Sequence, residues 1–325
     1  MRLFVEPLCA VALNSFLGFA DMLSPRSILA PFTPRTAQPT ALLHALSLAS
    51  RLQVPLHVTP WPGSEATASA QDVRVAVRSY VSDGPPPPHI HVAAWEERPF
   101  SVDEWLQYTQ RHAVDLITLS RFDAKAPAPP MACTDLQPMI MRTKAALLMV
   151  QVPSDTAGFA QVVVPTDITP EAVPTLHHAE ALAAVYNTQL TLLHVLQRRQ
   201  YVALTPTDLL SVDSATMAPR TAHRRLRTWY RRHAHPKHPL QESPRMKIEQ
   251  GDPATTIVQE TQDQSASLIV MAATQGTPRE AGLSPITENV LRRTTCPVFV
   301  TRPHHRSLVR PARISSGRSQ SASSS

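Results

Sequence analysis

Short apolar runs alternate with amphipathic stretches along most of the chain, and the clearest alternation lies between residues 161 and 303. Its apolar runs predict strands at Val162–Val164, Leu190–Val195, Met246–Glu249, Leu268–Ala272 and Val298–Thr301. Between them, apolar residues spaced three or four positions apart predict helices at Pro170–Asn187, Thr221–His233, Asp252–Gln262 and Pro285–Arg293. Strands that are apolar throughout and alternate with helices predict a parallel sheet that is covered on both faces.

The first half of the chain repeats this order of strands with a weaker pattern. Its strands are expected near Ile28–Ala30, Leu56–Thr59, His89–Ala93, Leu116–Leu119 and Leu147–Val150. A shift of 134 residues superposes the opening strand and helix of the two halves and aligns His44 with His178. We therefore interpret the chain as a diverged tandem duplication.

Length and composition predict how the chain is divided. Its 325 residues are about twice the usual domain length, and it holds 32 prolines but only eight glycines. We expect an apolar N-terminal extension or mis-chosen start at 1–25, a degenerate first domain at 26–153, a linker at 154–160, a second domain at 161–303, and a disordered Ser/Arg tail at 304–325. No apolar run predicts a membrane-spanning helix, and the spacing of the three cysteines suits a cytoplasmic protein without a disulfide framework.

Five stretches of the second half resemble the universal stress protein family. They are Val162–Asp167, Leu190–Val195, Gly251–Pro253, Leu268–Met271 and Thr287–Val298. The first half matches at its opening strand and helix and at its fourth and fifth strands. The resemblance implies two tandem, doubly wound, five-stranded parallel sheets of Rossmann-like α/β fold. Because the family's usual dimer pairs fifth strands, it also implies that Leu147–Val150 pairs with Val298–Thr301 in an intramolecular pseudo-dimer, and a homodimer stays open.

The resemblance also implies where an adenine nucleotide would bind. Nucleotide-binding members hold ATP, with Mg²⁺, between an Asp at the end of strand one and a Gly-x2-Gly-x9-Gly-Ser/Thr loop after strand four. The corresponding residues here are Pro165, Thr166, Asp167, Val195, Ala273, Gly276, Ser284, Pro285 and Ile286. In the first half Thr33 stands where the Asp is expected, and residues 121–138 contain no glycine. We therefore expect a nucleotide only in the second half.

The second half keeps the Asp as Asp167, but its phosphate loop departs from the family's pattern. Ala273 replaces the first glycine, and seven residues rather than nine follow Gly276. Ser284 and Pro285 then replace the final Gly-Ser/Thr. Pro285 has no N–H to donate to a phosphate, whereas Ser284 could cap the helix that it precedes. The sequence therefore leaves ATP binding open.

Two segments carry the positive charge of the chain. The formal net charge is +6, yet residues 219–240 alone hold seven cations without an acid, and residues 303–325 hold four more. Four arginines share one side of the predicted basic helix: Arg220, Arg224, Arg227 and Arg231. They could form an anion or nucleic-acid surface, or belong to a solvated helix whose aromatic residues pack on the sheet. The second interpretation is favoured, and a nucleic-acid partner is not expected.

No motif in the sequence marks a catalytic centre. GxSxG, HExxH and a complete P-loop are absent, and no spacing indicates a metal site. We interpret His44, His178 and Cys296 as packing residues. The resemblance then predicts a non-catalytic regulatory or protective module of the stress response, with an adenine nucleotide as the candidate ligand of the second half. A protein-interaction scaffold without a nucleotide, a nucleic-acid binder and weak ATP hydrolysis stay open as alternatives, and no protein partner is indicated.

Overall fold

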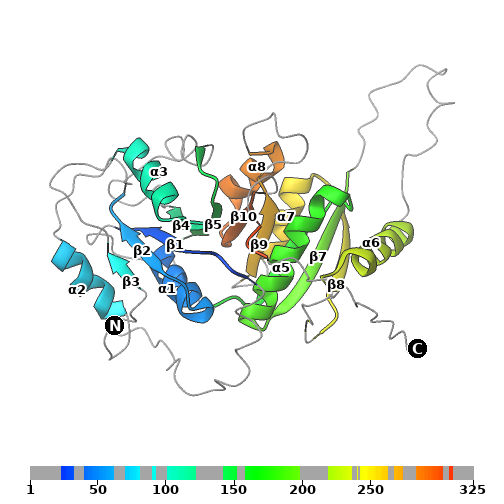
Figure 1. Ribbon diagram of the computed structural model, residues 1–325. Coiled ribbons are helices and arrows are strands. Elements are labelled where there is room, and N and C mark those ends of the chain that lie inside the picture. The colour runs from blue at the N-terminus through cyan, green and yellow to red at the C-terminus, as the bar shows by residue number, and fades with distance from the viewer. Residues whose placement is uncertain are drawn as a thin grey trace, which may run out of the picture.

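The computed structural model describes thirteen stretches of the chain. They are residues 23–32, 40–61, 70–80, 90–92, 101–121, 142–151, 158–197, 219–235, 240, 242–262, 267–273, 283–302 and 307–309. These residues form a ten-stranded sheet with helices on both of its faces (Figure 1). Thr33, Gly276 and most of the two regions compared with a phosphate loop, 121–138 and 273–284, lie outside the described residues.

The strand order of the sheet is β3-β2-β1-β4-β5-β10-β9-β6-β7-β8. The first half supplies β1 Ile28–Pro31, β2 Leu56–Thr59, β3 Ile90–Val92, β4 Leu116–Arg121 and β5 Ala146–Gln151. The second half supplies β6 Gln161–Pro165, β7 Gln189–Leu196, β8 Arg245–Gln250, β9 Ser267–Ala272 and β10 Val298–Thr301. Each half is parallel throughout and has the order 3-2-1-4-5 counted from its own first strand. The predicted doubly wound α/β fold is confirmed.

The fifth strands of the two halves join them into one sheet. β10 pairs antiparallel with β5, so that Phe299 lies opposite Leu148 and Val300 opposite Leu147. These four side chains are at most 1% exposed. The pairing that was predicted from the resemblance is thus confirmed, and it removes two open strand edges.

Helices cover the two faces of the sheet in two layers. One layer contains α1 Thr40–Leu52, α2 Ala70–Tyr80, α5 Val173–Tyr186 and α6 Pro219–His233; the other contains α3 Val102–Arg111, α7 Pro253–Gln262 and α8 Pro285–Arg293 (Figure 1). Successive side chains of a strand pack against opposite layers, as those of Ile28 and Leu29 do. The sequence analysis did not predict α2 or α3. Ser101 and Glu104 nevertheless form a capping box that marks the start of α3.

The ends of α1 and α5 have the same geometry, 134 residues apart. Gln53 and Asn187 both adopt the left-handed conformation, each with φ of 53°. After them, the N–H of Val54 donates to Ala49 O at 3.1 Å, and the N–H of Thr188 donates to Ala183 O at 2.9 Å. This repeated helix ending supports the internal repeat, whereas its origin by duplication stays a prediction.

The helix expected at Pro170–Asn187 begins differently from the prediction. Pro170–Ala172 forms a 3₁₀ turn, and the α-helix starts at Val173. Pro174 has no N–H to complete an α-helical bond to Pro170, and the N–H of Val173 closes the tighter turn on Pro170 O instead. Thr169 precedes the turn, but its side chain makes no capping bond.

Three predicted boundaries need correction, because apolar residues within the expected extension, linker and tail belong to the core. Leu23 and Val309 form an antiparallel bridge, and the N–H of Ser24 donates to Leu308 O at 2.7 Å. Leu23, Leu308 and Val309 are at most 6% exposed. Phe159, inside the expected linker, is likewise buried and stacks on His44.

Candidate functional site

The order of the strands makes the carboxyl ends of β6 and β9 a topological switch point, the place where open α/β sheets have their ligand crevice. β6 pairs with β7 on one side and β9 on the other. The helix that follows β6, α5, lies on one face of the sheet, whereas the helix that follows β9, α8, lies on the opposite face. Open α/β sheets bind their ligands at such a point, where the connections diverge. Asp167 follows β6 here, and Ala273 follows β9.

The turn after β6 fixes the position of the Asp167 carboxylate. Its Oδ1 accepts hydrogen bonds from the Thr169 N–H at 3.2 Å and the Thr169 hydroxyl at 2.8 Å. The Thr166 hydroxyl accepts from the N–H of Ile168 at 3.1 Å, and Ile168 adopts the left-handed conformation with φ of 64°. The side chain of Asp167 itself is exposed. The carboxylate is therefore held by its own turn and faces solvent at the edge of the sheet.

The neighbouring strand brings further predicted contacts to the same edge. Pro165 lies opposite Leu193 in the parallel register, so β6 ends two residues before Asp167 and beside the strand that continues to Val195. The N–H of Thr166 donates to Leu193 O at 2.9 Å, and His194 Nδ1 lies 2.8 Å from Thr166 O. Pro165, Asp167 and Val195, separated in the sequence, are thus gathered at one strand end. The N–H of Thr166 is already used by the sheet.

Ser284 caps α8, as the sequence predicted. Its hydroxyl accepts from the Thr287 N–H at 3.1 Å, and its own N–H donates to Ala273 O at 2.6 Å. The Thr287 hydroxyl lies 2.9 Å from Ala272 O, to which it donates. Pro285 occupies the first helical position without an N–H. Four groups that could otherwise face a phosphate are therefore bonded to the protein, and the N–H of residue 285 is missing.

The two ends of the crevice differ in how well they fit ATP. The nucleoside end offers the exposed carboxylate of Asp167, which suits ribose hydroxyls. The phosphate end relies on the first turn of α8, where Ile286 is the one residue whose N–H has no partner among the described residues. A helix N-terminus binds anions through several such N–H groups acting together. The described residues thus fit the nucleoside better than the phosphates.

The remaining candidate residues have structural partners. His178 Nδ1 lies 2.6 Å from Pro174 O, and its Nε2 accepts from the Leu308 N–H at 3.2 Å. Cys296 is buried and donates to Thr261 O at 3.1 Å, and burial raises the pKa of its thiol. The packing roles predicted for both residues are confirmed. No three His, Cys, Asp or Glu in the described part of the chain could hold a metal ion together.

Glu180 is a buried ionisable residue that the sequence did not single out. It is 1% exposed, and its Oε2 accepts from the N–H of His235 at 3.0 Å. Burial raises the pKa of its carboxyl to about 7. Its position within the apolar face of α5, one helical turn after His177, was the available signal. Glu180 ties α5 to the end of α6 and lies away from the crevice.

Comparison with known proteins decides the family. The model of the universal stress protein family matches residues 158–302. This segment is a universal stress protein domain. It contains the whole second half of the sheet, together with Asp167 and the cap of α8. Among curated proteins, none matches the sequence of the chain.

Solved structures resemble the chain beyond this universal stress domain. A functionally unknown protein from Pseudomonas aeruginosa PAO1 aligns with a TM-score of 0.60 at 17% identity, over 88% of this chain and 94% of that protein. A universal stress protein from Archaeoglobus fulgidus DSM 4304 aligns with a TM-score of 0.54 at 14% identity, over 86% of this chain and 97% of its own. At such identities the likeness shows the fold, which here extends over both halves.

No helix in the described part of the chain has both the length and the apolar character needed to cross a membrane.

Proposed function

We propose that the chain is a non-catalytic regulatory or protective protein of the universal stress type, whose second half binds an adenine nucleotide mainly through its nucleoside part. The exposed Asp167 carboxylate at the diverging strand ends carries this proposal. Its turn is already formed, so binding does not have to order it. We propose that the first half serves as the built-in partner of the universal stress domain through β5 and β10.

The contacts of α8 suggest that phosphates add little to the affinity. The Ser284 N–H, the Ser284 hydroxyl and the Thr287 N–H all have protein partners. A phosphate would have to replace these bonds, whereas the ribose would meet a carboxylate that is open to solvent. ATP with Mg²⁺ is therefore expected to bind about as tightly as adenosine.

Isothermal titration of the full chain with ATP and Mg²⁺, AMP and adenosine tests the proposal. The D167N variant keeps an oxygen for the Thr169 bonds but loses the charge. We expect it to weaken all three ligands by about 10- to 100-fold, because a hydrogen bond to a charged group contributes about 1.5–3 kcal/mol. The matched control is D252N, since Asp252 is also exposed and accepts from the N–H and hydroxyl of a threonine, Thr255.

A second variant tests the phosphate end separately. S284G/P285T replaces the cap and the proline with the Gly-Thr pair of the nucleotide-binding members. It should raise the affinity for ATP without changing that for adenosine. No heat with any of the three ligands would refute nucleotide binding and favour a scaffold that acts through protein partners. Turnover of ATP above that of D167N would refute the non-catalytic role.

A further inference from the structure

One face of α6 belongs to the core and fixes the orientation of the helix. Ala222, Leu226 and Trp229 are at most 7% exposed, and Leu226 and Trp229 pack in the same apolar cluster as α5. The indole N–H of Trp229 donates to Thr169 O at 3.2 Å. The packing that was expected for this helix is therefore confirmed. Its opposite face must point to solvent.

That opposite face carries a row of arginines. Arg220, Arg224, Arg227 and Arg231 are exposed, and at 3.6 residues per turn they fall within an arc of about 60°. The row extends over about 16 Å of helix axis. The helix contains no acidic residue, and none of these four arginines forms an ion pair with another described residue. The charge of the row is therefore not neutralised by the described part of the protein.

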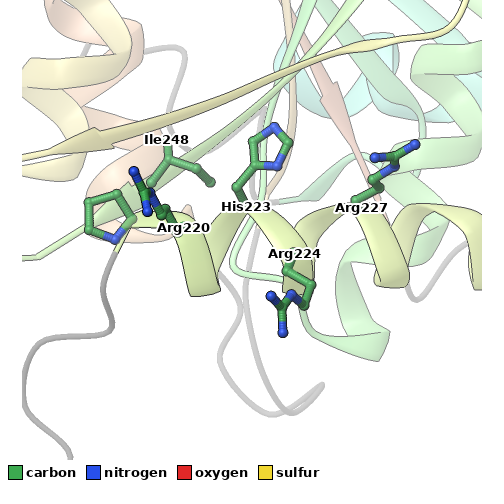
Figure 2. A pocket seen from close by; sticks show the side chains of 6 residues that line it. Arg220, His223, Arg224, Arg227 and Ile248 are labelled. Atoms are coloured by element: carbon green, nitrogen blue, oxygen red, sulfur yellow. The ribbon is translucent and has the colours of Figure 1, made fainter.

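A shallow hollow of about 580 Å³ runs beside this row, between α6 and β8. It is lined by Pro219, Arg220, His223, Arg224, Arg227 and Ile248. Figure 2 shows Arg220, His223 and Arg227 on the side of the helix that faces Ile248, whereas Arg224 projects from the other side. The lining includes no acid. Arg220 and Arg227 thus flank a concave surface, Arg224 borders it from the far side of the helix, and Arg231 lies beyond its lining.

The surroundings of this surface argue against two kinds of partner. A helix that lies in a membrane surface needs exposed apolar residues to insert, but Leu226 and Trp229 are buried within the protein. Proteins that bind single-stranded nucleic acid stack its bases on exposed aromatic rings. Trp229 is buried, and Tyr230 is half-buried and hydrogen-bonded to Glu180. What remains is a set of guanidinium groups, which pair well with phosphate oxygens.

We propose that the arginine row of α6 and the hollow beside β8 bind the phosphate backbone of a nucleic-acid duplex without reading its sequence. The sequence alone favoured a solvated helix. The hollow, the burial of Trp229 and the lack of ion pairs between these arginines and any described residue change that balance. Arginines spaced about 4.5–6 Å apart along the axis could contact successive phosphates of a strand in a duplex. Each contact releases a counterion, so binding must weaken steeply with salt.

Fluorescence anisotropy of the full chain with a labelled DNA duplex of about 20 base pairs, measured across salt concentrations, tests the proposal. In the R220Q/R224Q/R227Q variant the negative slope of log K against log salt should become shallower by about 2.7, since each lost contact removes about 0.9 from its magnitude. The matched control is R74Q/R78Q/R111Q, which removes the same charge from exposed positions of the first half. The control should keep the slope of the wild-type chain.

Several outcomes would overturn the proposal. They are the absence of duplex binding at 50 mM salt, an equal fall in slope in both variants, and tighter binding of a single strand than of the duplex. Binding of anionic vesicles without binding of the duplex would point to a lipid surface and would also overturn it. Circular dichroism melting of each variant verifies that the substitutions leave the fold intact.

Discussion

His44 and His178 occupy equivalent positions in the two halves, yet their ring nitrogens have different surroundings. Both residues are at least 95% buried, and burial lowers the pKa of each imidazole from 6.5 to about 4. The nitrogens of His178 contact Pro174 O and the Leu308 N–H. Neither nitrogen of His44 has a partner among the described residues, and its ring stacks on Phe159 with centroids 5.1 Å apart. Comparing the two histidines separates the effect of burial on the stability of the fold from the effect of hydrogen bonding.

The lowered pKa of His44 predicts a defined loss of stability in acid. The unfolded chain takes up a proton near pH 6.5, whereas the folded chain resists it until about pH 4. The unfolded state therefore binds more protons between these values, and the stability falls as the pH falls through this window. Between pH 7.5 and pH 5 the loss due to His44 is about 2 kcal/mol. Glu180 acts in the opposite direction, because its pKa is raised to about 7.

The H44L variant isolates this contribution, since Glu180 and His178 titrate in both proteins and cancel in the difference. Urea unfolding followed by circular dichroism should show H44L close to the wild type at pH 7.5. At pH 5 it should be more stable than the wild type by about 2 kcal/mol. H178L should instead lower the free energy of unfolding by about 1–3 kcal/mol at pH 7.5, because it leaves the buried Leu308 N–H without its acceptor. A difference between H44L and the wild type that stays constant with pH would refute the argument.

Three further substitutions test the junction, the cap and the C-terminal segment by guanidinium unfolding. F299A should lower the free energy of unfolding by about 3–5 kcal/mol, because Phe299 is fully buried where β10 pairs with β5. A loss below 1 kcal/mol would contradict the contribution of this junction to stability. S284A should lower the free energy of unfolding by about 1 kcal/mol, because it removes the hydroxyl that caps α8. S284T keeps a capping hydroxyl and should retain most of the stability of the wild type. L308A should lower the free energy of unfolding by about 2 kcal/mol, because Leu308 is 2% exposed and packs in the same apolar cluster as α5; an unchanged stability would contradict this packing.

The central strands could be predicted because a strand that is buried on both faces must consist almost entirely of apolar residues. β5 and β10 lie between two helical layers, and both are runs of large apolar residues that stand out in the sequence. The outer helices of the first half were harder to predict. α2 mixes charged and apolar residues within one short helix, and α3 is marked mainly by Ser101 and Glu104. Leu308 lies in a polar tail and packs through contacts with residues far away in the sequence, which no local pattern reveals.

The candidate site was only partly predictable because it depends on which group is the partner of each hydrogen bond at the start of α8. The sequence places Asp167 after a buried strand, and the parallel register brings the end of that strand, Pro165, beside Leu193. It does not say whether an N–H at the start of α8 faces a ligand or a neighbouring side chain. The structure answers this at Ser284, whose hydroxyl and N–H are both committed to the protein. A helix whose first turn is satisfied internally has less need of an anion there.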